Sequence, residues 1–207
     1  MHYNFCTELR RKGLHLLALI IPWGMLQIGK HTGLILLLLL AGLSLGLDLG
    51  RAYLPSLAKL MGKLGKAFMR PEENPDTFYR GLIAINGSTW IFISAFFLLL
   101  LFPARVASLA LALFLLGDAA SGLVGQKFGR ISWRISDRTV EGSLAFLAAS
   151  LPAVWFWPVQ IQIWIAAAAA VCACLVEVLP GPLNDNLQAP LSAALLITIL
   201  ESLPQIG

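Results

Sequence analysis

Residues 110–130 read ALALFLLGDAASGLVGQKFGR, an apolar run that is interrupted by Asp118 and followed by glycines. An apolar helix of about 20 residues is long enough to cross the hydrocarbon core of a bilayer. At about 1.5 Å per residue, Asp118 would lie about 10 Å from the end of this helix near Gly125. A carboxylate at that depth is costly unless a partner, a metal ion or water compensates it, so such residues are commonly functional. The segment therefore predicts a membrane helix that carries a functional acid.

The whole chain has the composition of a membrane protein. Of its 207 residues, 58% are hydrophobic and 13% are charged, and the mean hydropathy is +0.79. We predict an all-α, polytopic integral membrane protein with about seven transmembrane helices in a single domain, residues 1–207. The predicted spans are residues 13–28, 33–49, 80–102, 104–125, 139–157, 160–179 and 186–200. The first is expected to be a retained anchor, because no small-residue cleavage pattern follows it. The lipid bilayer is the expected partner, and no nucleic acid is expected.

Charged residues divide unevenly between the two sides of this topology. Of 15 Lys and Arg residues, only Lys30 and Arg105 fall opposite the N-terminus, and of 11 acidic residues only Glu201 does. Because positive charge marks the cytoplasmic side, we predict a cytoplasmic N-terminus in an inner or plasma membrane. The concentration of ionisable groups predicts an active site on that cytoplasmic face.

A basic amphipathic segment lies between the second and third predicted spans. In residues 51–70, apolar side chains recur at intervals of three and four, and lysines and arginines recur on the opposite stripe. This pattern predicts an amphipathic helix in the membrane interface, with its basic face toward headgroups or an anionic ligand. A short coiled coil is the alternative, but two heptads are too few to favour it.

Small residues follow Asp118 at helical spacing. They are Ser121, Gly122, Gly125 and Gly129. A helix face of this kind lets another backbone or a ligand approach closely, and a seam for helix packing is the alternative interpretation. The acid in the same face favours a binding site.

A basic loop re-enters the membrane directly after this helix. Residues 125–143 read GQKFGRISWRISDRTVEGS. Cations would neutralise a polyphosphate there, and hydroxyls and glycine amides at a helix start would contact its oxygens. The cations are Lys127, Arg130, Arg134 and Arg138, and the other candidates are Thr139, Glu141, Gly142 and Ser143. Positive-inside charge and helix capping are the alternatives, although a capping box with Glu141 would need Ser or Thr where Arg138 stands.

Polar residues also lie at the ends of the first two predicted spans. Glu8, Lys12 and His15 share one helix face by their spacing. His15 is either a group that titrates near neutrality or a buried, hydrogen-bonded residue. Asp48 and Arg51 lie one turn apart and suit a local ion pair.

Acids recur where the last two predicted spans meet the same face. Glu177 lies in an apolar helix end, and Asp185 and Asn186 begin the last span. Helix capping explains Asn184 or Asp185 without a functional role. Carboxylates are ligands that Mg²⁺ prefers, so their convergence with Asp118 beside a basic loop predicts a magnesium site.

Four segments together resemble a known family. ELRRKGLH, GDAASGLVGQKFGR, DRTVEGS and DNLQAPL occur in this order between Glu8 and Leu191. The ordered set resembles the CTP-dependent lipid-alcohol kinases, which include dolichol kinase, phytol kinase and a CTP-using diacylglycerol kinase. The central pattern is also similar to that of the phosphatidate cytidylyltransferases.

The resemblance implies a membrane enzyme that transfers the γ-phosphoryl group of CTP to a long-chain alcohol, with Mg²⁺ and a cytoplasmic site. It singles out Glu8, Lys12, His15, Asp118, Gly122, Gly125, Gly129, Thr139, Glu141, Gly142, Asp185 and Asn186. Where many relatives have lysine this chain has Arg138, which can make a bidentate contact. The implied acceptors are phytol, geranylgeraniol, farnesol, dolichol, another polyprenol or diacylglycerol.

Phosphoryl transfer needs a metal ion, cations and alignment of the attacking oxygen, which suggests a role for each group. Asp118, Asp185 and Glu177 are the predicted metal ligands, and His15 or Asp118 would take the hydroxyl proton. The predicted nucleotide-binding residues are Lys12, Gly122, Gly125, Lys127, Gly129, Arg130, Arg138, Thr139, Glu141, Gly142 and Asn186.

Two other functions compete with the kinase. A cytidylyltransferase would form a CDP-lipid and release pyrophosphate, but the histidine-containing C-terminal signature of that class is missing, since the last histidine is His31. A small membrane transporter should place ionisable groups at several depths and often has repeated halves. The sequence contains neither feature, and this favours the kinase.

Overall fold

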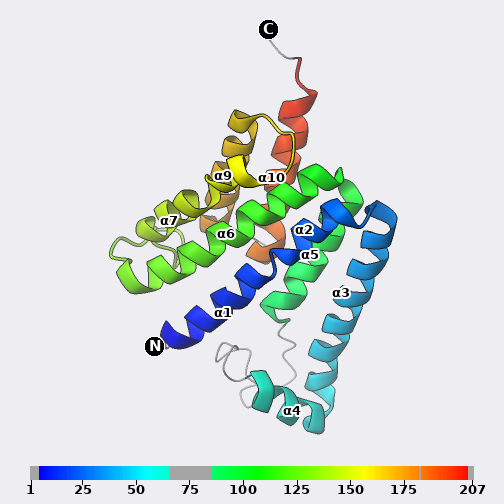
Figure 1. Cartoon of the computed structure of the whole chain (residues 1–207). Helices are drawn as coiled ribbons and strands as arrows, with labels where there is room; N and C mark the ends of the chain where they lie inside the picture. The colour runs from blue at the N-terminus through cyan, green and yellow to red at the C-terminus, as the bar shows by residue number, and fades with distance from the viewer. Residues whose placement is uncertain (1–4, 66–84, 182, 205–207) are drawn as a thin grey trace.

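The computed structural model describes residues 5–65, 85–181 and 183–204, and these are built from helices (Figure 1). Within these ranges no strand forms, and one isolated antiparallel bridge joins Ser132 and Thr139. The helices are α1 (Phe5–Leu17), α2 (Ile20–Gln27), α3 (Lys30–Tyr53), α4 (Pro55–Gly65), α5 (Gly87–Leu101), α6 (Ala104–Phe128), α7 (Val140–Ser150), α8 (Ala153–Phe156), α9 (Ile163–Val178) and α10 (Asp185–Ser202). The all-α prediction is confirmed.

Helix α6 is the centre of the structure. Its most apolar window is 78% buried, and every side chain of residues 106–115 is buried. Helices α1, α2, α5, α7, α9 and α10 all pack against it. A helix enclosed in this way can hold a polar group only where that group has a partner. The surroundings of Asp118 therefore indicate what this residue does.

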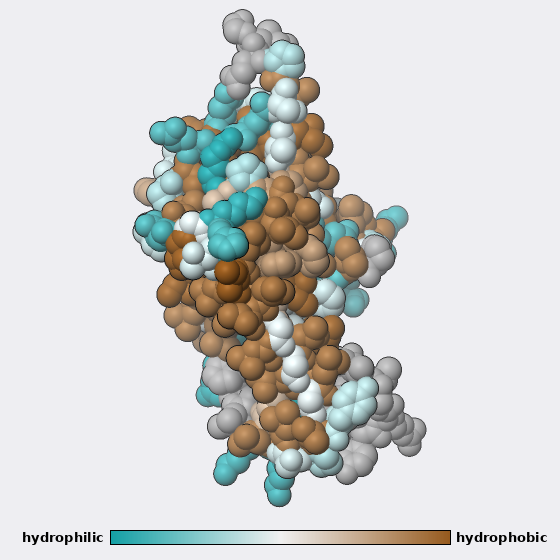
Figure 2. All heavy atoms as spheres, turned by 90° about the vertical axis from the view of Figure 1, so that its right-hand side faces the viewer, coloured by the Kyte–Doolittle hydropathy of each residue, from teal (hydrophilic) through white to brown (hydrophobic). Residues whose placement is uncertain are grey.

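Helix α3 lies at the edge of the structure, with α5 and α4 as its main neighbours. Its most apolar window is only 17% buried, and Figure 2 shows this side of the molecule as a largely apolar surface. By length and composition, α3 over residues 30–51 and α6 are the two helices of the described chain that could cross a membrane. The structure is thus compatible with membrane association, and the count of seven spans stays a prediction.

Prolines break two of the predicted spans. The predicted span 13–28 is two helices, because Pro22 has no N–H to donate and its ring would clash with the Ala18 carbonyl in a continuous helix. The predicted span 139–157 is likewise divided into α7 and the short α8, with Pro152 between them. The sequence analysis did not predict these two breaks.

Of the predicted interfacial helix, residues 51–70, residues 51–53 are the end of α3 and residues 55–65 form α4. Leu54 is extended, with φ −114° and ψ 102°, because the ring of Pro55 disfavours helical backbone in the preceding residue. Helix α3 therefore ends there, and α4 begins as a separate helix. Residues 66–70 and 80–84, which include the predicted start of the third span, lie outside the described residues.

A buried polar cluster holds α3 against the start of α5. The Asp48 carboxylate accepts hydrogen bonds from the Asn86 backbone N–H at 2.9 Å, the Asn86 side-chain amide at 2.7 Å and the Thr89 hydroxyl at 2.6 Å. Arg51 lies 3.4 Å from Asp48 and donates to the Asn86 side-chain oxygen at 3.2 Å. The predicted Asp48–Arg51 ion pair is therefore present, and it belongs to a contact between two helices.

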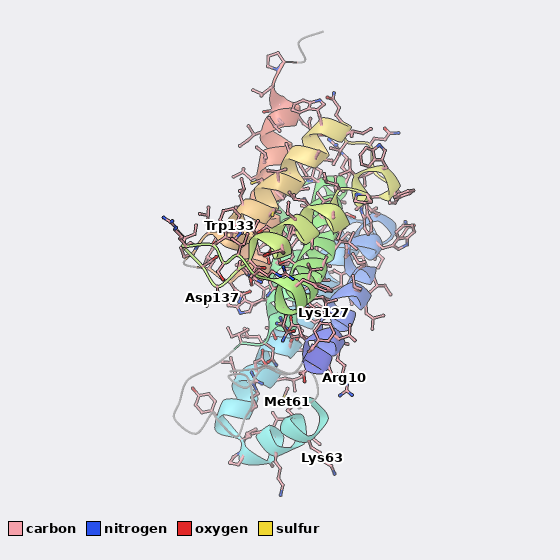
Figure 3. The ribbon with its side chains drawn as sticks, turned by 90° about the vertical axis from the view of Figure 1, so that its left-hand side faces the viewer. Arg10, Met61, Lys63, Lys127, Trp133 and Asp137 are labelled. Atoms are coloured by element: carbon pink, nitrogen blue, oxygen red, sulfur yellow. The ribbon has the colours of Figure 1, made fainter. Side chains whose placement is uncertain are left out.

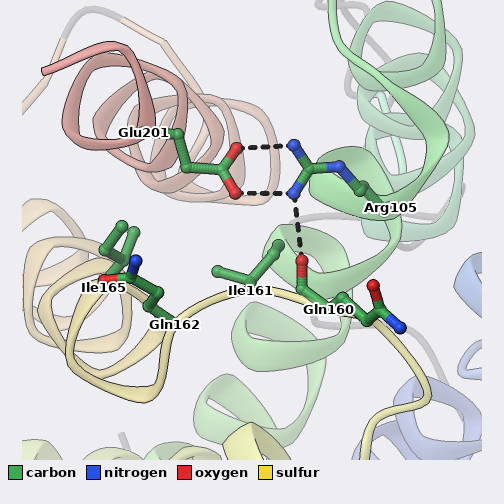
Figure 4. Close-up of a pocket in the computed structure, with 6 residues that line it drawn as sticks. All are labelled: Arg105, Gln160, Ile161, Gln162, Ile165 and Glu201. Atoms are coloured by element: carbon green, nitrogen blue, oxygen red, sulfur yellow. Dashed lines mark hydrogen bonds and ion pairs between the residues drawn. The ribbon is translucent and has the colours of Figure 1, made fainter. Parts of the chain in front are cut away.

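The opposite end of the structure carries an exposed ion pair (Figure 4). Arg105, in the first turn of α6, contacts both carboxylate oxygens of Glu201 at 2.6 and 2.9 Å, and also donates to the Gln160 carbonyl at 3.2 Å. These residues line a pocket of about 550 Å³ together with Ile161, Gln162 and Ile165. The Arg105 side chain is 44% exposed, so solvent screens the pair and its contribution to stability is small.

The two ion pairs predict different responses to mutation. Asp48→Asn should lower the free energy of unfolding by about 2 kcal/mol, because an amide cannot accept all three hydrogen bonds that the buried carboxylate accepts from Asn86 and Thr89. Glu201→Gln should lower it by less than about 1 kcal/mol, because that pair is exposed. Denaturant unfolding of the purified protein in detergent measures both values. Equal losses would contradict the difference in burial.

Candidate active site

Helices α1 and α6 meet at a buried ion pair. The Lys12 ammonium donates to Asp118 Oδ2 at 2.6 Å, and His15 Nε2 lies 3.4 Å from the same oxygen. Lys12 is only 1% exposed, and Glu8, Lys12 and His15 are the buried residues of α1. The spacing of these three residues correctly predicted that they share one face, and that face packs on α6.

Helix α10 extends this contact. Asn186 Oδ1 lies 3.3 Å from His15 Nε2. Asn184 caps α10, and its side-chain oxygen accepts hydrogen bonds from the Asn186 backbone N–H at 3.0 Å and side-chain amide at 2.8 Å. The cap therefore fixes the side chain that faces His15, so capping by Asn184 also positions Asn186.

Arg138 joins two further acids to the cluster. Its guanidinium lies 3.1 Å from Glu177 Oε1 and also donates to Asp185. Burial alone would lower the pKa of Arg138, but the carboxylates of Glu177, Asp118 and Asp185 raise it above its ordinary value. The guanidinium is therefore a permanent charge beside three acids.

Sequence analysis placed Ser121 on the small-residue face of Asp118 but gave it no contact or role. Its hydroxyl donates to Glu177 Oε1 at 2.9 Å and is buried. Ser121 lies three residues after Asp118, so the two side chains share a face of α6. The structure shows that this face meets Lys12 on one helix and Glu177 on another, which helical spacing alone could not predict. Arg11, also not predicted, contacts Glu8 at 2.7 and 3.2 Å.

Glycines on α6 and α7 permit close approach at two places. A Cβ atom on Gly122 would lie 2.3 Å from Lys12 Cε and 2.9 Å from Nζ, so the lysine stem occupies the space of a side chain. A Cβ atom on Gly125 or Gly142 would lie 3.0 Å from the Thr139 hydroxyl, and one on Gly129 would lie 2.6 Å from its methyl carbon. Thr139 is the N-cap of α7 and accepts the Gly142 N–H at 3.1 Å. The small residues therefore serve helix packing around Thr139 and leave room for Lys12.

Three predicted nucleotide-binding residues lie outside this cluster. The Lys127 ammonium lies 5.5 Å from the centre of the Phe5 ring and 5.3 Å from that of Phe128. Arg130 is exposed, and Glu141 accepts the Ile131 backbone N–H at 3.3 Å. Figure 3 shows Lys127 near the end of α6, on the side that carries the loop with Trp133 and Asp137. Their role in nucleotide binding stays a prediction.

The three predicted metal ligands are Asp118, Glu177 and Asp185, and each is paired with a cation in the structure. The described residues contain no group of three or more His, Cys, Asp or Glu side chains arranged to hold a metal ion. Asp118 is paired with Lys12, and Glu177 and Asp185 with Arg138. Mg²⁺ on a nucleotide commonly uses only one or two protein carboxylates, and phosphates and water supply the other ligands. Carboxylates released from Lys12 and Arg138 could serve in that mode, and the metal stays a prediction.

Comparison with known proteins adds one full-length relative. The uncharacterized protein RP860 of Rickettsia prowazekii (strain Madrid E) is 27% identical over 202 residues, which cover 95% of this chain and 96% of that protein. No protein-family profile matches the chain. No solved structure matches it significantly. The resemblance to the lipid-alcohol kinases therefore rests on the sequence motifs and stays a prediction.

Adding a methyl group should destabilise the protein at Gly122 but not at Gly42. Gly122→Ala should push Lys12 away from Asp118 and lower the free energy of unfolding by about 2 kcal/mol, because a buried charge pair is broken. Gly42→Ala is the matched control, since nothing lies within 4 Å of a Cβ atom there. That change should stabilise α3 by up to about 1 kcal/mol through helix propensity. Equal stabilisation of both variants in detergent unfolding experiments would contradict the contact.

Proposed function

We propose that this protein is a membrane-embedded lipid-alcohol kinase, which transfers the γ-phosphoryl group of CTP to a long-chain isoprenoid alcohol or diacylglycerol. The observation that carries the proposal is the network in which Asp118 contacts Lys12 and His15 next to Arg138 and Asn186. These five residues come from the four separate segments that resemble the kinase family. A chance resemblance would give no reason for all four segments to meet at one place.

We further propose that the chain crosses the membrane about seven times, with the N-terminus and the site on the cytoplasmic side. The two long apolar helices support a membrane location, and the distribution of lysine and arginine supports the orientation. The acceptor would enter from the lipid, with its tail among the helices and its hydroxyl at the level of the headgroups.

Phosphoryl transfer depends mainly on positioning and on charge stabilisation. Lys12 and Arg138 would bind phosphate oxygens, and both are held in place by acids before the nucleotide arrives. The alcohol oxygen forms a bond to the γ-phosphorus, the bond from that phosphorus to the β–γ bridging oxygen breaks, and CDP leaves. The hydroxyl proton passes to Asp118 or to His15. Mg²⁺ held by Asp118 and Asp185 would neutralise charge on the phosphates.

An assay of both products tests the proposed reaction. Purified protein is incubated with Mg²⁺, a panel of alcohols, and CTP labelled either in the γ-phosphate or in the cytosine ring. The expected products are a lipid that carries the γ-label and free CDP that carries the ring label. Ring label in the lipid together with pyrophosphate would identify a cytidylyltransferase, which is the alternative enzyme. If no alcohol is phosphorylated and the protein in proteoliposomes carries an ion or solute across the membrane, the protein is a transporter.

Asp118 is the residue whose loss should abolish transfer. Asp118→Asn is expected to lower kcat by about 10³-fold, because both charge stabilisation and the hold on Lys12 are lost. Glu201→Gln, which also converts a carboxylate to an amide but lies at the opposite end of α6 and α10, should retain full kcat. Circular dichroism and gel filtration check that both variants fold. Full activity of the Asp118 variant would exclude this residue from the reaction.

A further inference from the structure

The loop that joins α6 to α7 is a short hairpin, residues 129–139. The Trp133 N–H donates to the Arg138 carbonyl at 2.9 Å, and the Val140 N–H donates to the Ile131 carbonyl at 2.8 Å. The indole of Trp133 also donates to the Ser143 hydroxyl on α7 at 3.0 Å. Figure 3 shows the hairpin, with Trp133 and Asp137, projecting beyond the ends of the two helices.

Bulky apolar side chains of the hairpin are exposed. Ile131 is 62% exposed, Ile135 53% and Trp133 37%. Two cations, Arg130 and Arg134, are exposed beside them. Three partly exposed side chains offer much less area than the roughly 800 Å² per partner that a stable protein interface buries. Tryptophan and aliphatic side chains flanked by arginines are instead typical of the boundary between headgroups and hydrocarbon.

We propose that the outer face of this hairpin, formed by Ile131, Trp133 and Ile135 with Arg130 and Arg134, docks on a bilayer that contains anionic phospholipids. The apolar tips would enter the region between headgroups and acyl chains, and the arginines would contact lipid phosphates. Arginines near an anionic bilayer surface each favour binding by about fivefold at physiological salt. This assigns Arg130 to lipid phosphate and not to the phosphates of a nucleotide.

The docking face is connected to the candidate active site through the backbone. Arg138, which binds Glu177 and Asp185, lies directly across the hairpin from Trp133, and its carbonyl accepts the Trp133 N–H. The arm of the hairpin that carries Ile131 and Trp133 is also held to α7, because Glu141 accepts the Ile131 N–H. A bilayer that holds Trp133 in place therefore also restrains Arg138. This effect on catalysis rests on the proposed kinase function, whereas the docking itself does not.

Tryptophan fluorescence in reconstituted vesicles tests the docking without any assay of activity. The chain is placed in vesicles of phosphatidylcholine and phosphatidylglycerol of one fixed composition, in which either lipid carries brominated chains that quench indole. The emission of Trp133 is the difference between the wild-type chain and Trp133→Phe. We expect quenching by both brominated lipids, and stronger quenching by brominated phosphatidylglycerol because the arginines enrich it locally.

A double substitution, Arg130→Gln with Arg134→Gln, should make the two brominated lipids equally effective toward Trp133. Trp164→Phe provides the control: Trp164 is exposed at the start of α9, and its quenching should be the same with and without the double substitution. Preserved quenching of Trp164 also shows that the double variant is folded.

Three results would overturn the proposal. Trp133 could be quenched by aqueous iodide and not by brominated lipid, which would place it in water. Both lipids could quench it equally in the wild-type chain, which would remove the preference for anionic headgroups. The double substitution could leave lipid quenching unchanged and raise KM for CTP, which would assign the arginines to the nucleotide. A failure of the kinase assay alone would leave the fluorescence result standing.

Discussion

The pairing of Lys12 with Asp118 is the interaction on which the rest of the structure depends. A carboxylate in the buried helix α6 would be strongly unfavourable alone, and the ammonium at 2.6 Å compensates it. Because the cation comes from α1, the pair requires α1 to lie on α6. The lysine stem crosses α6 at Gly122, where a methyl group would lie 2.3 Å from Cε, so the same contact also requires a glycine. The buried charge of Asp118 thus determines that α1 packs on α6 and that residue 122 is a glycine.

The charge balance of the cluster suggests what it can bind. The three cations Lys12, Arg11 and Arg138 face four acids, Glu8, Asp118, Glu177 and Asp185, so the group holds no excess of positive charge. A triphosphate cannot enter such a site favourably unless positive charge enters with it. A divalent cation supplies that charge, and carboxylates freed from Lys12 and Arg138 are suitable ligands for it. The acids and the basic residues are therefore consistent with one ligand, a nucleotide that carries Mg²⁺.

Helical spacing predicted which residues within one helix share a face. It did not predict which residues from different helices contact each other. The shared face of Glu8, Lys12 and His15 follows from helical spacing alone. The contacts of Arg138 with Glu177 and Asp185 join residues about 40 positions apart, and no local pattern encodes such pairs. The helix break before Pro22 was readable from the proline, but hydropathy favoured one long span. The position of Lys127 between two phenylalanine rings depends on where α1 lies, which its own segment does not encode.

The position of Arg138 is set by the backbone as much as by its acidic partners. Thr139, the next residue, caps α7 and fills the space that Gly125, Gly129 and Gly142 leave open between α6 and α7. Any side chain at these glycines would displace Thr139, and Arg138 would move with it. Glycines without close neighbours, such as Gly42 and Gly46, lie on α3 at the edge of the structure. Close contacts also occur at other glycines, such as Gly33 with Leu99 and Gly117 with Phe146, but those around Thr139 are the ones that fix Arg138 beside the acids of α9 and α10.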